Sequence, residues 1–126
     1  MKKILLSFCI VLLASSAYAA QVIPEDADKL PAIPKGLSIS EAYTSGPSPY
    51  LKQTMSSEKF LAKLIPDNWK VYCEKGILKH KQRIKTDPEN NWFTELDIWL
   101  NITNFRALVS PKTHEVFVRK SIGGYI

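Results

Sequence analysis

The sequence predicts a small α+β domain, and three patterns between residues 56 and 120 carry that prediction. Two segments repeat apolar residues at helical spacing, and short segments between and after them alternate apolar and polar residues as strands do. All three tryptophans, Trp69, Trp92 and Trp99, lie in this stretch. We therefore expect two helices and four or five strands around one modest core, in a domain over residues 55–121.

Residues 1–19 have the pattern of a secretory signal. Lys2 and Lys3 precede an apolar run over residues 4–14, and Ala17-Tyr18-Ala19 is a small-x-small cleavage site. We expect cleavage before Ala20 and a soluble exported chain; an uncleaved N-terminal anchor is the alternative. The chain has 17 basic and 12 acidic residues, and losing Lys2 and Lys3 leaves it only mildly basic, which does not predict a nucleic-acid partner.

Residues 20–54 are rich in proline and polar side chains, and we expect an extended arm that cannot fold on its own. The prolines of this segment are Pro24, Pro31, Pro34, Pro47 and Pro49. Within it, residues 36–40 alternate in polarity and predict a strand that joins the domain or a partner. A plain tether is the alternative.

The first helix is expected to begin at a cap, Ser56 or Ser57, and to end at Pro66. Its apolar stripe consists of Phe60, Leu61, Leu64 and Ile65. Residues 69–74 then alternate as a half-buried strand, with Trp69, Val71 and Cys73 on the inward face.

A loop over residues 86–90 leads to the second helix, for which Asn90 or Asn91 is the expected cap. Its stripe consists of Trp92, Phe93, Leu96, Trp99 and Leu100, and Glu95 and Asp97 are expected outside it. Residues 105–110 and 115–120 predict two strands joined by a hairpin turn, with His114 solvated at its tip. Residues 122–126 are expected to be a flexible tail.

A basic run over residues 78–85 is the candidate partner-binding surface. On a strand it places Lys79, Lys81, Arg83 and Lys85 on one face and His80 on the other, less polar face. Such a strip suits an acidic partner. A solvated face, or an edge strand guarded by charge against aggregation, is the alternative.

No constellation for catalysis, cofactor binding or metal binding stands out in the sequence, so we do not expect an enzyme. Cys73 is the one cysteine left after signal removal and is expected to be a buried small hydrophobe. The alternative is a nucleophile paired with His80 or His114, since such partners meet only in the fold.

The domain resembles a known family at spaced positions over residues 60–120. Those positions are Leu64-Ile65-Pro66-Asp67-Asn68-Trp69-Lys70-Val71-Tyr72, then Asn91-Trp92 at the start of a helix with Leu96, Phe105-Arg106-Ala107 and Val116-Phe117-Val118. They resemble the C-terminal domain of the toxin-coregulated pilus biosynthesis protein Q family. The layout also resembles the N0 domain, the short N-terminal domain of secretins and TonB-dependent proteins.

The resemblance implies a periplasmic, non-enzymatic accessory protein of a type IVb pilus system, like those of the bundle-forming pilus. Such a protein binds the outer-membrane secretin and other pilus assembly proteins, and it promotes secretin multimerisation or localisation. It would be peripheral to the membrane at most. The alternative function is an exported binding module for an anionic envelope component such as peptidoglycan.

Overall fold

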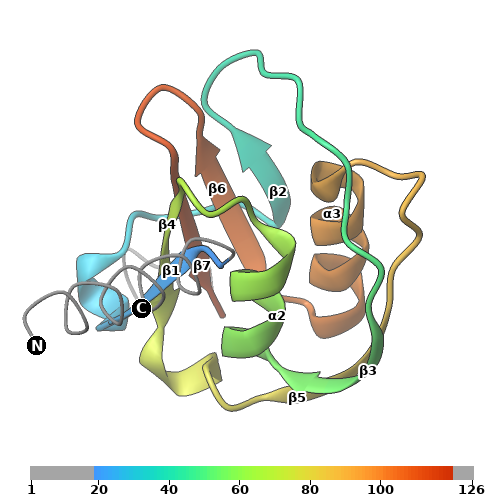
Figure 1. Cartoon of the computed structure of the whole chain (residues 1–126). Helices are drawn as coiled ribbons and strands as arrows, with labels where there is room; N and C mark the ends of the chain where they lie inside the picture. The colour runs from blue at the N-terminus through green and yellow to red at the C-terminus, as the bar shows by residue number, and fades with distance from the viewer. Residues whose placement is uncertain (1–18, 121–126) are drawn as a thin grey trace, which may run out of the picture.

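The predicted α+β class is confirmed by the computed structural model, which describes residues 19–120 (Figure 1). These residues contain two α-helices and seven strands, and the strands form one five-stranded sheet and one two-stranded sheet. The expected signal, apart from Ala19, and the expected tail over residues 122–126 lie outside the described residues.

The five-stranded sheet has the order β1-β4-β7-β6-β2. Its members are β1 (Gln21–Glu25), β4 (Lys70–Glu74), β7 (Glu115–Arg119), β6 (Arg106–Ser110) and β2 (Gly36–Ile39). β6 and β7 form the predicted antiparallel hairpin, and every other neighbouring pair is parallel. Register aligns Val71 with Val116 and Val109, so β-branched side chains fill the centre of the inner face.

Helices α2 (Ser57–Leu64) and α3 (Trp92–Thr103) cover this inner face (Figure 1). Both predicted caps are confirmed: Ser56 accepts a hydrogen bond from the Lys59 N–H, and Asn91 accepts one from the Thr94 N–H. α3 ends at Asn104, which adopts the left-handed conformation at φ 64°. The buried faces of both helices share one apolar core with β4, β6 and β7.

The two-stranded sheet pairs β3 (Lys52–Ser56) with β5 (Lys81–Lys85) in antiparallel register. We expected a strand over residues 78–85, but the strand begins only at Lys81. A 3₁₀ helix, η2 (Lys75–Ile77), precedes it, and Ile77 is buried in the core. The carbonyls of Leu78 and His80 accept hydrogen bonds from Glu58 N–H and Ser57 N–H, which holds this turn against the start of α2.

Residues 20–54 are not an arm outside the domain. They supply β1 and β2, the two edges of the large sheet, and most of β3, so a boundary at residue 55 cuts through a strand. The strand expected over residues 36–40 joins the domain itself, as the parallel partner of β6. Pro24 is tolerated because β1 is an edge strand, where one missing N–H need not break the ladder.

The connection between β1 and β2 crosses the outer face of the sheet and is held there by two arginines. It includes a short 3₁₀ helix, η1 (Ala27–Lys29). The buried Arg119 donates from Nη1 to the carbonyls of Leu30 (2.9 Å) and Pro31 (2.8 Å), and Arg106 donates to the carbonyl of Ile33 (3.3 Å). Leu30 and Ile33 are buried as a result.

The residue before β1 donates a hydrogen bond to a backbone carbonyl of α2 that Pro66 leaves without a donor. In an α-helix the Ala62 carbonyl would accept from the N–H of residue 66, but proline has none. The Ala20 N–H donates to the Ala62 oxygen instead, at 2.9 Å. Pro66 therefore ends α2 as predicted, and the same residue creates the acceptor that fixes the N-terminal edge of the sheet.

Candidate functional site

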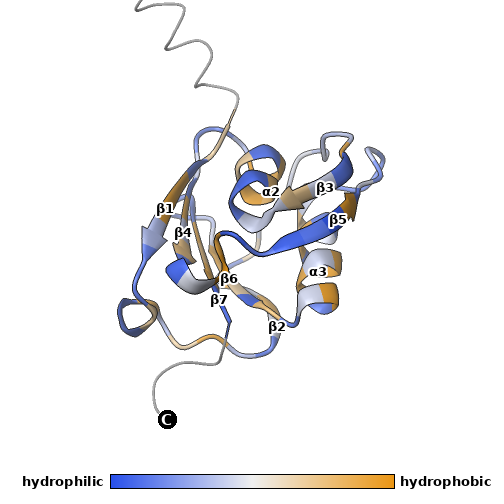
Figure 2. Ribbon diagram, turned by 90° about the horizontal axis from the view of Figure 1, so that it is seen from below, coloured by the Kyte–Doolittle hydropathy of each residue, from blue (hydrophilic) through white to orange (hydrophobic). Residues whose placement is uncertain are grey.

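The exposed face of the two-stranded sheet carries four basic side chains, Lys52, Lys81, Arg83 and Lys85, which we call the basic ribbon. Register pairs Lys52 with Lys85, Thr54 with Arg83 and Ser56 with Lys81. Directly opposed residues share a face, so these six side chains point the same way. The alternate positions Met55 and Ile84 are buried against the core. The ribbon lies at the N-terminal end of α2 and beside α3, and β5 is the most hydrophilic part of that region (Figure 2).

The predicted strip agrees with the basic ribbon at three positions. Lys81, Arg83 and Lys85 are exposed on β5, whereas Lys79 is exposed on the turn before the strand and is not part of the strand face. Lys52 replaces it on the face. Lys52 was not predicted because it lies in the segment that was expected to be an arm.

The basic ribbon has no acidic partner within the part of the chain that the structure describes. Lys52 and Lys85 are directly opposed, and like charges in that position destabilise an antiparallel pair. No ion pair between described residues offsets the repulsion between these two lysines. The direct opposition of Lys52 and Lys85 is what distinguishes the ribbon from an ordinary solvated face.

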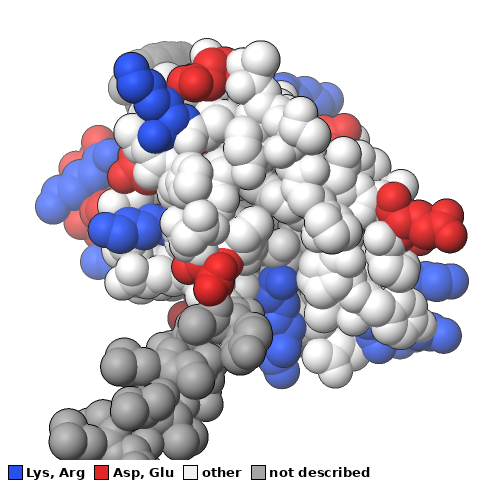
Figure 3. All heavy atoms as spheres, turned by 45° about the horizontal axis from the view of Figure 1, so that its top comes forward, with Lys and Arg blue, Asp and Glu red and all other residues white. Residues whose placement is uncertain are grey.

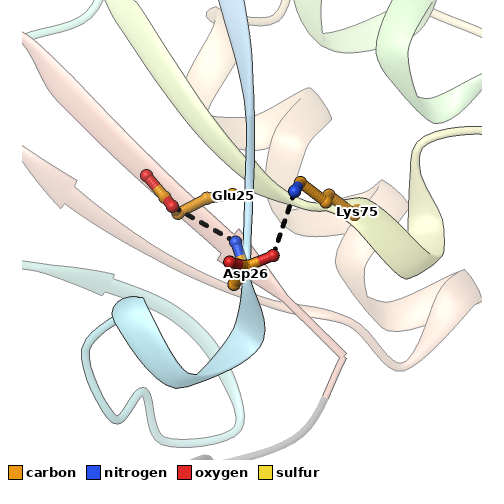
Figure 4. A network of polar contacts seen from close by, with 3 residues as sticks. All are labelled: Glu25, Asp26 and Lys75. Carbon is orange, nitrogen blue, oxygen red and sulfur yellow. Dashed lines mark hydrogen bonds and ion pairs between the residues drawn. The ribbon is translucent and has the colours of Figure 1, made fainter.

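One described cation outside the ribbon does have an acidic partner. The ion pair found among the described residues joins Lys75 Nζ to Asp26 Oδ1 at 3.0 Å, while the Asp26 N–H donates to the Glu25 carboxylate (Figure 4). The Lys75 ammonium lowers the pKa of Asp26, first by the hydrogen bond and then by its charge. On the face shown in Figure 3, basic and acidic side chains are scattered around an uncharged centre, so neither sign dominates.

A buried carboxylate braces the loop that follows β5. Glu95 of α3 is 4% exposed, and its Oε2 accepts hydrogen bonds from the Asp87 N–H (3.0 Å) and from Asn90 Nδ2 (2.8 Å). We expected Glu95 outside the apolar stripe, and that expectation was wrong. It lies one turn from both Trp92 and Trp99, so helical spacing already places it on the buried side.

The structure gives no support to Cys73 as a nucleophile. The side chain is fully buried in the core as predicted, and burial raises the pKa of its thiol to about 12. A thiol with that pKa stays protonated at neutral pH, and the thiolate is the reactive form.

The two candidate histidine partners have other contacts. His80 is exposed and makes an edge contact with Phe105, with ring centroids 5.2 Å apart. His114 is not simply solvated: its ring stacks on Trp69 at 4.8 Å and its Nδ1 contacts Asn68 Nδ2. Among the described residues, no group of three or more His, Cys, Asp or Glu side chains is arranged to hold a metal ion.

Comparisons with known proteins found no matching family model, no matching curated protein and no matching solved structure. Across residues 19–120, no helix has the length and apolar character needed to cross a membrane. The candidate site therefore rests on its own geometry.

Proposed function

We propose that this protein is a periplasmic, non-enzymatic accessory factor of type IVb pilus biogenesis. It binds the outer-membrane secretin through the basic ribbon and promotes the multimerisation or localisation of that secretin. The secretory signal and the family resemblance support the compartment and the pilus system. The observation that carries the docking role is the opposed pair Lys52 and Lys85 on a face of four cations without an acidic partner among the described residues.

Stability alone does not account for such a pair, because like charges in direct opposition destabilise an antiparallel pair, whereas an opposite-charge pair would contribute roughly 0.2–1 kcal/mol. An acidic partner surface would relieve the repulsion on binding. Complementary charge would also raise the association rate and select the partner, and both effects would weaken with salt. The fold can present the ribbon in this way because its inner side is anchored by Met55 and Ile84.

The variant Lys52→Glu separates binding from folding. It places a carboxylate opposite Lys85, so the free energy of unfolding should rise by roughly 0.2–1 kcal/mol while capture of the secretin falls. The measurement is a pull-down from envelope extracts with the tagged chain beginning at Ala20, together with urea denaturation. Lys112→Glu, an equal charge change on the exposed β6–β7 turn, is the matched control and should capture the secretin normally.

The same variant also tests the alternative that the cations only guard an edge against aggregation. A glutamate guards an edge as well as a lysine does. Unchanged secretin capture by Lys52→Glu and by the double variant Lys81→Glu/Arg83→Glu would contradict the docking role. A deletion strain should in addition lose the heat-resistant secretin multimer.

A module for an anionic polymer is the second candidate, because the same four cations would attract one. Cosedimentation of the chain with purified peptidoglycan sacculi, abolished at moderate salt, would favour it. Secretin capture that persists after the extract is cleared of sacculi would favour the assembly factor.

A further inference from the structure

Two exposed isoleucines of α3 lie beside the basic ribbon. Ile98 and Ile102 are 43% and 55% exposed and stand one helical turn apart, so they share a face. A shallow depression between β5 and α3 brings them together with Arg83 and Lys85. Single exposed apolar residues are ordinary on protein surfaces, whereas these two adjoin on one helix face and border the basic ribbon.

A larger hollow opens at the Lys85 end of the ribbon. Its volume is about 380 Å³, and Tyr50, Lys85 and Ile98 are among its walls. Tyr50 is 60% exposed. Apolar wall, aromatic ring and cation therefore occur within one concavity, and the hydrogen bonds that Glu95 makes to Asp87 and Asn90 fix its far side.

We infer that this combined surface binds a segment of a partner protein in which acidic residues accompany an apolar anchor. The acidic residues meet the basic ribbon, and the anchor lies on Ile98 and Ile102 or enters the hollow beside Tyr50. The inference rests on the proposed docking role of the ribbon and specifies the chemistry of the partner.

Charge within the hollow favours a protein segment over an anionic lipid surface. Asp87 and Glu95 line the hollow, and their carboxylates would repel a phosphate headgroup. A concave wall also suits one inserted side chain better than a flat bilayer surface. Lys85 also lines the hollow, whereas Lys52, Lys81 and Arg83 lie on the open ribbon, where carboxylates of a passing chain can reach them.

Three labelled synthetic peptides test this inference: one of alternating glutamate and leucine, one of glutamate and serine, and one of glutamine and leucine. Fluorescence anisotropy with the chain beginning at Ala20 should rank the glutamate–leucine peptide at least about tenfold tighter than either of the others. Equal binding of the glutamate–leucine and glutamate–serine peptides would overturn the inference.

The double variant Ile98→Gln/Ile102→Gln should lose the preference for leucine over serine and keep its binding of the glutamate–serine peptide. Glutamine is a good helix former, so α3 should remain intact, which circular dichroism checks. Ile39→Gln, the same change at a 41% exposed position on β2, is the control and should keep the preference.

Vesicles of phosphatidylglycerol and phosphatidylcholine give the competing outcome. Isoleucine-dependent cosedimentation with these vesicles, without the peptide preference, would overturn the inference in favour of a lipid surface. The secretin pull-down separates the two proposals: normal capture by Ile98→Gln/Ile102→Gln with loss of capture by Lys52→Glu would leave the docking role standing and contradict the anchor.

Discussion

Arg119 links the sheet to the segment that crosses its outer face. Its side chain is 3% exposed, and its Nη1 donates to two carbonyls of that segment, those of Leu30 and Pro31. Arg119→Met keeps an unbranched aliphatic stem but removes the guanidinium, which leaves the buried Leu30 carbonyl and the part-buried Pro31 carbonyl unpaired, so we expect a loss of about 2–3 kcal/mol in urea denaturation. Arg83→Met on the exposed ribbon is the control and should change stability by less than about 0.5 kcal/mol.

The buried thiol of Cys73 makes the free energy of unfolding depend on pH in the alkaline range. Burial raises the pKa of its thiol from 9.0 to about 12, so above pH 9 the folded state keeps a proton that the unfolded chain loses. The free energy of unfolding should therefore fall as pH rises from 9 towards 12, by at most about 1.4 kcal/mol per pH unit from this group. The free energy of unfolding should fall more for wild type than for Cys73→Ala between pH 9 and pH 12. An equal change in both proteins would contradict the assignment.

At the scale of elements, β1 depends on the backbone hydrogen bonds of Ala20 and Gln21. A chain that begins at Ala20 keeps a donor for the Ala62 carbonyl, now as an ammonium group at the C-terminal end of α2, where positive charge is favoured. A chain that begins at Val22 loses this bond and the one from Gln21 N–H to the Trp69 carbonyl. We expect it to be less stable by about 1–3 kcal/mol in thermal or urea unfolding.

A chain that begins at Ala19 serves as the control for this truncation. It keeps the amide donor at Ala20, so its stability should lie within about 0.5 kcal/mol of the Ala20 chain. If the Val22 chain were as stable as both, the pairing of β1 with β4 would not need the contact with α2.

The local sequence was sufficient to predict the elements that pair with a neighbour close in the chain or that carry a complete set of helix signals. Both helices have a cap, an apolar stripe and a stop, and the β6–β7 hairpin needs only a short turn. The strands β1 and β3 were harder to identify, and for β2 the strand was predicted but its partner β6 was not. β1 contains Pro24, β3 reads Lys-Gln-Thr-Met-Ser, and each strand pairs with residues far along the chain. Edge strands can be short and polar because only one side is paired, so their sequences carry little signal.

The candidate site could likewise be predicted only in part. Lys81, Arg83 and Lys85 follow strand alternation and were found from the sequence, but the opposed Lys52 depends on a pairing that no local pattern shows. The hollow near Tyr50 likewise forms only when loop, strand and helix meet. The charge of the surface could thus be predicted from the sequence, whereas its concavity and its opposed lysines could not.

At the scale of the whole molecule, residues 20–54 determine whether the rest can fold. They contribute both edges of the large sheet, the partner of β5, and the buried side chains of Leu30 and Ile33. Without them β4 and β6 become exposed edges and β5 has no neighbour. A fragment that begins at residue 55 should therefore fail to unfold cooperatively, although it contains both helices and the β6–β7 hairpin.

Circular dichroism and urea titration of this fragment, beside the chain that begins at Ala20, test the point. We expect a sharp transition for the longer chain and a gradual, non-cooperative change for the fragment, because too little apolar surface remains buried to offset the entropy of ordering it. Adding residues 20–54 as a separate peptide should restore secondary structure if strand pairing alone is missing. A sharp transition in the fragment by itself would mean that α2, α3 and the three central strands form an independent core. Residues 20–54 would then add little to the stability of that core, as expected of an arm, although their strands are paired with it.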